Sequence, residues 1–180
     1  DFTERGALGV TGGDEVAERI STYLAAHSAD YEIVVASRDW HDGDNDNGGH
    51  FSPAPDFVDT WPVHCVADTY GAAYDDVFDT AAVTHHLKKG QGKPAYSLFE
   101  GVSDDGNTAA ALLDEHGIRD IDVVGLATDY CVRASALDAL AHGRRVRVFT
   151  DLVAGVHPES SAAALAEIEA AGAEVVGSGG

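Results

Sequence analysis

Residues 121–131, Ile-Asp-Val-Val-Gly-Leu-Ala-Thr-Asp-Tyr-Cys, decide the fold class. The apolar run at 121–127 is typical of a buried strand, and a turn of small residues then leads into a helix predicted over 129–142. Strands alternating with helices predict a parallel sheet covered by helices on both faces, a three-layer α/β/α fold. The other predicted strands are 31–37, 82–88, 146–150 and 173–176, and the other predicted helices are 14–27, 107–116 and 159–171.

The length of 180 residues suits one domain with a full hydrophobic core, and we expect a single domain over residues 1–180. Folds of this class normally begin with a strand that enters the first helix. Here the helix at 14–27 follows a loop that opens with Asp1, and the sequence contains no methionine. We therefore expect that a first strand is missing from this chain.

The charge balance excludes several classes of partner. The chain has 31 acidic and 11 basic residues, which gives a formal net charge of -20. Nucleic acids and anionic membranes are both recognised by clustered Lys and Arg, so neither is an expected partner. We expect a cytoplasmic protein, either a monomer or a homo-oligomer. Its acidic, lysine-poor composition suits a high-salt cytoplasm or an ordinary acidic protein equally well.

A long segment without regular pattern, residues 39–65, carries candidate metal ligands. A loop of that length in a compact domain is usually functional. Asp39 and His41 stand two positions apart at a predicted strand end and point to the same side of an extended backbone. With His50 and His64 they form a mixed oxygen and nitrogen set that suits zinc, iron(II) or manganese(II). The alternative is a group of singly solvated histidines, and we favour the metal site.

Cys131 is a candidate nucleophile because it falls at the start of the helix after the 121–127 strand. Helix N-terminal amides lower the pKa of a thiol and can also hold an oxyanion. The alternative is a small buried cysteine that only packs. Lys88 and Lys89 end another predicted strand, where a cation would stabilise a thiolate, although a solvated pair is the simpler interpretation.

Three aromatic residues stand near these groups in the sequence. They could wall a pocket for a flat ring, or they could simply belong to the core and its rim. They are Phe2, Trp61 and Tyr96.

Taken in order, these stretches resemble the nicotinamidases (pyrazinamidases) of the isochorismatase-like hydrolase superfamily. The resemblance runs across nearly the whole chain. The Asp-Trp-His stretch and the Trp-Pro-Val-His-Cys stretch make it specific to nicotinamidases within that superfamily. The matching residues are 1–2 with 6–8 and 11–13, 39–41 with 49–52, 61–66 with 69–72, 89–90 with 96–99, and 125–132.

The resemblance implies a six-stranded parallel sheet and a Cys-Lys-Asp triad, with Cys131 as the nucleophile and Lys89 as the lysine. It implies an oxyanion hole from the backbone amides of Ala127 and Cys131, with a cis peptide bond before Ala127. One divalent metal ion (zinc, iron or manganese) would hold the ring nitrogen of the substrate. The implied metal ligands are Asp39, His41, His50 and His64, and the implied ring-pocket residues are Phe2, Trp61 and Tyr96.

The implied activity is hydrolysis of nicotinamide, and of pyrazinamide, to nicotinate and ammonia through a cysteine thioester, a step in NAD salvage. The triad aspartate of the family lies on the first strand, a few residues before the Asp-Phe pair that opens this chain. Two alternatives therefore stay open. One is another hydrolase of the superfamily, acting on a different small amide or cleaving an ether. The other is an inactive metal-binding homologue, if the aspartate is truly absent.

Overall fold

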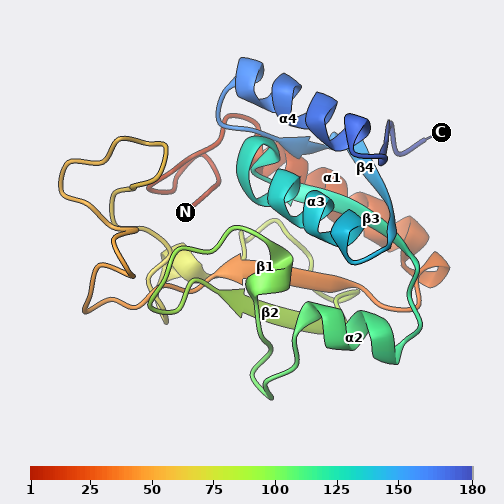
Figure 1. Ribbon diagram of the computed structural model, residues 1–180, viewed down its shortest axis with the longest axis horizontal. Coiled ribbons are helices and arrows are strands. Elements are labelled where there is room, and N and C mark those ends of the chain that lie inside the picture. Colours follow the sequence, from red (N-terminus) through yellow and green to blue (C-terminus); the bar gives the residue numbers. More distant parts are fainter. Residues whose placement is uncertain (180) are drawn as a thin grey trace.

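The structure, a computed structural model, describes residues 1–179 as two parallel sheets with helices packed around them (Figure 1). The first sheet pairs β1 (Val35–Asp39) with β2 (His85–Lys89). The second has the order β3 (Asp120–Leu126), β4 (Arg145–Ala154) and β5 (Glu174–Val176). The helices are α1 (Gly13–His27), α2 (Ala109–Glu115), α3 (Arg133–Ala141) and α4 (Pro158–Ala170). Short 3₁₀ turns occupy Ser28–Asp30, Tyr70–Ala72 and Leu98–Glu100, and a π-helical turn occupies Thr128–Val132.

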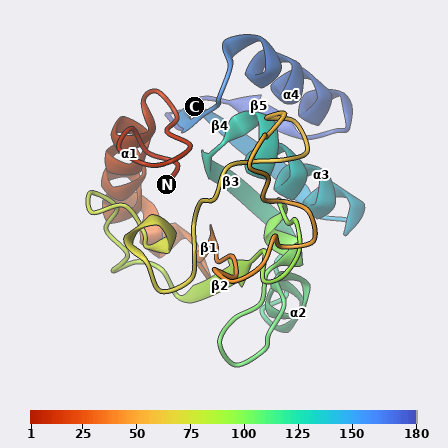
Figure 2. The ribbon, with the colours of Figure 1, turned by 90° about the vertical axis from the view of Figure 1, so that its left-hand side faces the viewer.

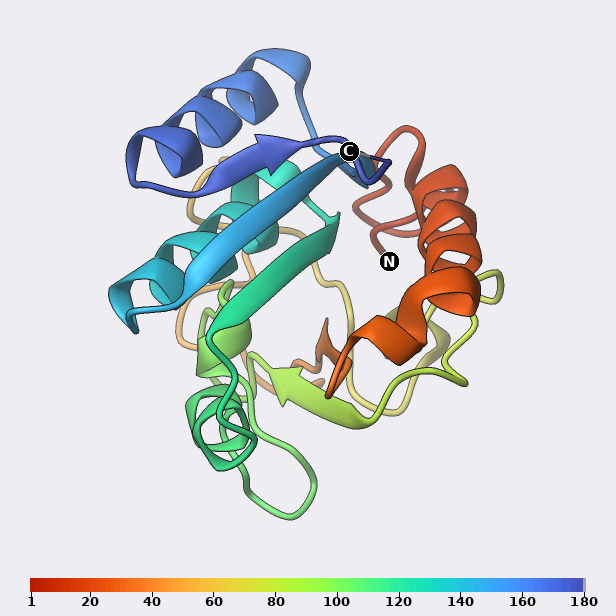
Figure 3. The same ribbon diagram turned by 90° about the vertical axis from the view of Figure 1, so that its right-hand side faces the viewer.

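The β3-β4-β5 sheet is covered on both faces, which gives the three predicted layers. Neighbouring residues of β4 point to opposite faces, as the strand period of two requires. Val148 packs with residues of α3 and α4, whereas Phe149 packs with residues of α1. Figure 3 shows α1 on one side of this sheet and α3 with α4 on the other. The α/β class and the parallel strands are thus confirmed.

The implied six-stranded sheet is not what residues 1–179 form. In this described range the strands make one sheet of two and one of three, and β1 and β3 are not hydrogen-bonded to each other. A cavity of about 390 Å³ lies between them. Side chains of β1, β3 and α1 line it, and it extends to Asp39, Lys89 and Cys131.

Several element boundaries differ from the sequence prediction. The strand expected at 31–37 begins only at Val35, because the side-chain hydroxyl of Thr84 accepts the N–H of Val34 and β2 begins at His85. The helix expected at 129–142 is divided into the π-helical turn and α3. The strand expected at 146–150 extends to Ala154.

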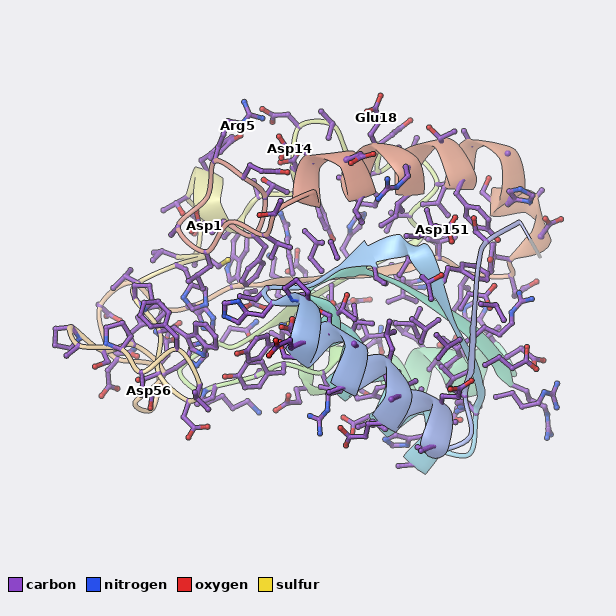
Figure 4. All side chains as sticks on the ribbon, turned by 90° about the horizontal axis from the view of Figure 1, so that it is seen from above. Asp1, Arg5, Asp14, Glu18, Asp56 and Asp151 are labelled. Carbon is purple, nitrogen blue, oxygen red and sulfur yellow. The ribbon has the colours of Figure 1, made fainter. Side chains whose placement is uncertain are left out.

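Acidic residues labelled in Figure 4 come from different parts of the chain. Asp14 and Glu18 on α1, Asp56 in the 40–84 segment and Asp151 on β4 lie on separate parts of the molecule (Figure 4). These labelled carboxylates are therefore spread rather than gathered at one site. Among the helices of residues 1–179, none has the length and apolar character needed to cross a bilayer.

Candidate active site

The carboxyl ends of β1, β2 and β3 meet at one end of the molecule, where the 40–84 segment crosses in front of them (Figure 2). Asp39 ends β1, Lys89 ends β2, and Cys131 lies in the turn after β3. The ammonium of Lys89 donates a hydrogen bond to the Asp39 carboxylate and lies 3.5 Å from the Cys131 sulfur. It also donates to the carbonyl of Ala95 at 3.3 Å. Open α/β sheets bind ligands at such strand ends.

Burial and charge together set the ionisation of these three groups. Lys89 is only 2% exposed and Asp39 5%. Burial is the largest single effect and acts against both charges. The attraction and hydrogen bond between the two groups, together with His41 beside Asp39 and Cys131 beside Lys89, outweigh it and hold the pKa of Asp39 below, and that of Lys89 above, its ordinary value. Burial raises the pKa of the Cys131 thiol, although Lys89 and a backbone hydrogen bond from Ala127 act in the opposite direction. A negative charge on this sulfur would thus be formed directly beside a fixed cation.

The turn that carries Cys131 is tightly bonded. The peptide bond between Leu126 and Ala127 is cis, as the resemblance implies. The carbonyl of Ala127 accepts the N–H groups of Tyr130 and Val132, both at 3.1 Å. This places Cys131 at the start of the helical segment, close to the backbone of Ala127.

Three buried histidines from the 40–84 segment face one another. One possible ligand atom from each of His41, His50 and His64 lies within 4.8 Å of the others. Hydrogen bonds fix two of the rings. His41 Nδ1 donates to the carbonyl of Gly90, and His64 Nδ1 donates to the carbonyl of Pro62, both at 2.8 Å. Carbonyl partners of this kind orient the remaining ring nitrogen of a metal-binding histidine.

The donor atoms at this cluster fit a divalent cation. His41 Nε2 and His50 Nδ1 are buried and have no hydrogen-bond partner within residues 1–179. The second oxygen of Asp39 lies 3.6 Å from His41 Nε2 and 3.9 Å from His64 Nε2. Burial lowers the pKa of His50 and of His64 to about 4, so both rings are neutral, as ligation requires. A set of three imidazoles and a carboxylate suits a borderline metal.

The aromatic residues singled out from the sequence border these groups. The Phe2 ring centroid lies 5.8 Å from that of His64, and the Tyr96 centroid lies 5.9 Å from that of His50. Trp61 donates its indole N–H to the Tyr96 hydroxyl at 3.0 Å. Phe2, Trp61 and Tyr96 thus come together from three distant parts of the chain.

Two further residues at this site were missed in the sequence. Tyr130 packs beside these rings, with its ring centroid 5.1 Å from that of Trp61 and 6.0 Å from that of Tyr96. We call Phe2, Trp61, Tyr96 and Tyr130 together the aromatic wall. Its position next to Cys131 was the available signal. Asp1 accepts the backbone N–H of Cys65 at 2.7 Å and so ties the Phe2 segment to the His64 segment. No local pattern indicated that contact.

The comparisons with known proteins agree with this geometry. The isochorismatase domain profile matches residues 1–179. A curated relative, the nicotinamidase/pyrazinamidase of Mycobacterium tuberculosis, is 46% identical over 176 residues, which cover 98% of this chain and 92% of that protein. The nicotinamidase of Escherichia coli is 36% identical over 194 residues, which cover 96% of this chain and 88% of that protein.

Solved structures share the fold over nearly the whole chain. The PnC1 protein of L. infantum, in complex with nicotinate, has a TM-score of 0.83 at 32% identity, with 99% of this chain and 88% of that chain covered. The pyrazinamidase of Pyrococcus horikoshii, in complex with zinc, has a TM-score of 0.80 at 36% identity, with 98% and 92% covered.

Proposed function

The chain belongs to the isochorismatase family, and we propose that it is a nicotinamidase, which hydrolyses nicotinamide and pyrazinamide to the acid and ammonia. The observation that carries this proposal is the Cys131 thiol beside the buried Lys89 ammonium, next to a cluster of three histidines. A thiol beside a cation supports acyl transfer, and the aromatic wall suits a flat heterocycle. In this role the protein acts in the cytoplasm, in NAD salvage.

The covalent step uses Cys131 as the nucleophile. Its sulfur attacks the carboxamide carbon, and the thiol proton passes through a base to the nitrogen, which leaves as ammonia. Water then cleaves the thioester, releases nicotinate and restores the thiol. The oxyanion is held by the backbone amides of Ala127 and Cys131, and Lys89 stabilises the charge that develops.

The step also needs a proton acceptor, which the resemblance implies to be an aspartate. Asp39, the carboxylate that contacts Lys89 within residues 1–179, already uses one oxygen for that ion pair and turns the other toward the histidines. Asp39 is therefore assigned to the metal cluster and not to proton transfer.

The histidine cluster would hold one divalent metal ion through His41, His50 and His64, with Asp39 beside them. When bound, such a cation supplies a Lewis acid that can hold the ring nitrogen of the substrate. Phe2, Trp61 and Tyr96 bind the ring itself. Binding the ring in this way places the carboxamide before Cys131.

A substrate panel tests the proposal. Ammonia release is measured with nicotinamide, pyrazinamide, benzamide and an aliphatic amide on the purified protein. We expect turnover of nicotinamide and pyrazinamide and little or none of the aliphatic amide. A preference for the aliphatic amide would favour another amidase of the superfamily. Binding of metal without any turnover would favour an inactive homologue.

A further inference from the structure

A carboxylate close to Cys131 makes contacts that the proposed chemistry does not use. Asp129 stands two positions before Cys131, in the turn Thr128–Val132. Its Oδ1 accepts the backbone N–H of Val156 at 3.0 Å, and its Oδ2 accepts that of His157 at 3.2 Å. Oδ2 also accepts the hydroxyl of Ser160 at 2.6 Å. All three donors belong to the start of α4 or to the residues just before it.

These bonds lie where α4 begins. His157 is the N-cap residue of α4, and its side chain makes no capping hydrogen bond. A carboxylate at a helix N-terminus binds amides that would otherwise lack partners and complements the helix dipole. Here the carboxylate comes from the nucleophile turn, and its three bonds to Val156, His157 and Ser160 join that turn to the start of α4.

The approach of the two segments is close. A Cβ atom added at Gly155 would lie 3.0 Å from Asp129 Oδ1 and 3.1 Å from Ser161 Cβ. The loop before α4 therefore packs directly against the carboxylate. A second connection lies further along α4. Arg133 forms a bidentate ion pair with Glu167, with Nε 2.6 Å from Oε2 and Nη2 2.7 Å from Oε1.

We propose that Asp129 is a positioning residue, which holds the 127–132 turn against α4. In this way it keeps the sulfur of Cys131 beside the Lys89 ammonium and the backbone amides of the oxyanion hole. The proposal rests on the proposed function, since it assumes that Cys131 is the nucleophile. Because a displacement of about 1 Å at a reacting group can cost about 100-fold in rate, a small shift of this turn would be visible in kcat.

The test compares Asp129→Asn with Glu167→Gln, which breaks the other connection between the turn region and α4. We expect Asp129→Asn to lower kcat about 10- to 100-fold with KM changed less than about twofold. We expect it also to shift the pH profile of Cys131 alkylation by iodoacetamide, followed by mass spectrometry. Glu167→Gln should leave kcat and the alkylation profile unchanged. Thermal unfolding shows which variants are folded.

A graded pair keeps the test decisive if Asp129→Asn does not fold. Ser160→Ala removes one of the three bonds and should give a smaller loss of kcat, whereas Ser160→Thr keeps the hydroxyl and should restore it. A wild-type kcat in folded Asp129→Asn or in Ser160→Ala would overturn the proposal, as would an equal loss in Glu167→Gln. If the wild-type protein releases no ammonia, the proposed function fails, and the alkylation profiles alone then judge the role of Asp129.

Discussion

The ammonium of Lys89 lies 3.5 Å from the sulfur of Cys131, although the two residues are 42 positions apart in the sequence. The contact exists because β2 and the turn after β3 end at the same place. The same ammonium is paired with the buried carboxylate of Asp39. One lysine thus links the proposed nucleophile to the histidine cluster.

The buried ion pair should matter for stability as well as for turnover. Lys89→Met leaves the Asp39 carboxylate buried without its partner, and breaking such a pair costs about 3–5 kcal/mol. Adding Asp39→Asn to Lys89→Met should recover part of that loss. The measurement is the free energy of unfolding in urea. Lys88→Met is the matched control, since Lys88 pairs with the exposed Asp104, and it should cost about 1 kcal/mol or less. Equal losses for Lys88→Met and Lys89→Met would contradict this account.

The histidine cluster should bind metal. Elemental analysis of the purified protein is expected to find about one divalent ion per chain, and His50→Ala should lose most of it because a buried ligand is removed. His27→Ala is the control, since His27 is exposed on α1 and lies outside the cluster. Full metal content in His50→Ala would argue against the site.

Stability of the metal-free protein should depend on pH through His50 and His64. Burial lowers the pKa of each from 6.5 to about 4 in the folded state. As the pH falls below 6.5, His50 and His64 become protonated in the unfolded chain but stay neutral in the folded chain. The free energy of unfolding therefore decreases between pH 6.5 and 4 and does not decrease further below pH 4 through these groups. The loss is on the order of 3 kcal/mol per histidine. Urea midpoints from pH 7 to 4 measure it. A slope unchanged in the double variant His50→Ala/His64→Ala would rule out these two groups as its source.

The aromatic wall should affect substrate binding more than the chemical step. Tyr96→Phe removes the acceptor of the Trp61 indole N–H, a bond worth about 1 kcal/mol. We expect KM for nicotinamide to rise about fivefold, while kcat changes less. Steady-state kinetics measure both constants. Tyr70→Phe, at a residue that is 64% exposed, serves as the control. A KM that does not change in Tyr96→Phe would remove Tyr96 from the ring pocket.

The fold class and the groups of the site could be predicted because both leave local patterns. The apolar run before Cys131 and the Asp-x-His spacing at Asp39 are visible in short windows of sequence. Contacts between distant segments leave no such pattern. The bonds of Asp129 to α4 and of Asp1 to Cys65 became visible only in three dimensions. The start of β1 at Val35 could not be predicted for the same reason, because it depends on a contact between Val34 and the hydroxyl of the distant Thr84.

The central claim is that Cys131 performs amide hydrolysis, and one assay tests it most directly. Release of ammonia and nicotinate from nicotinamide is measured for the purified protein and for its Cys131→Ala variant, alongside metal content. We expect equal amounts of both products from the wild-type protein. The variant should release neither product and should keep its metal, because Cys131 is not a ligand in the histidine cluster. Ammonia release that persists in Cys131→Ala would contradict the account.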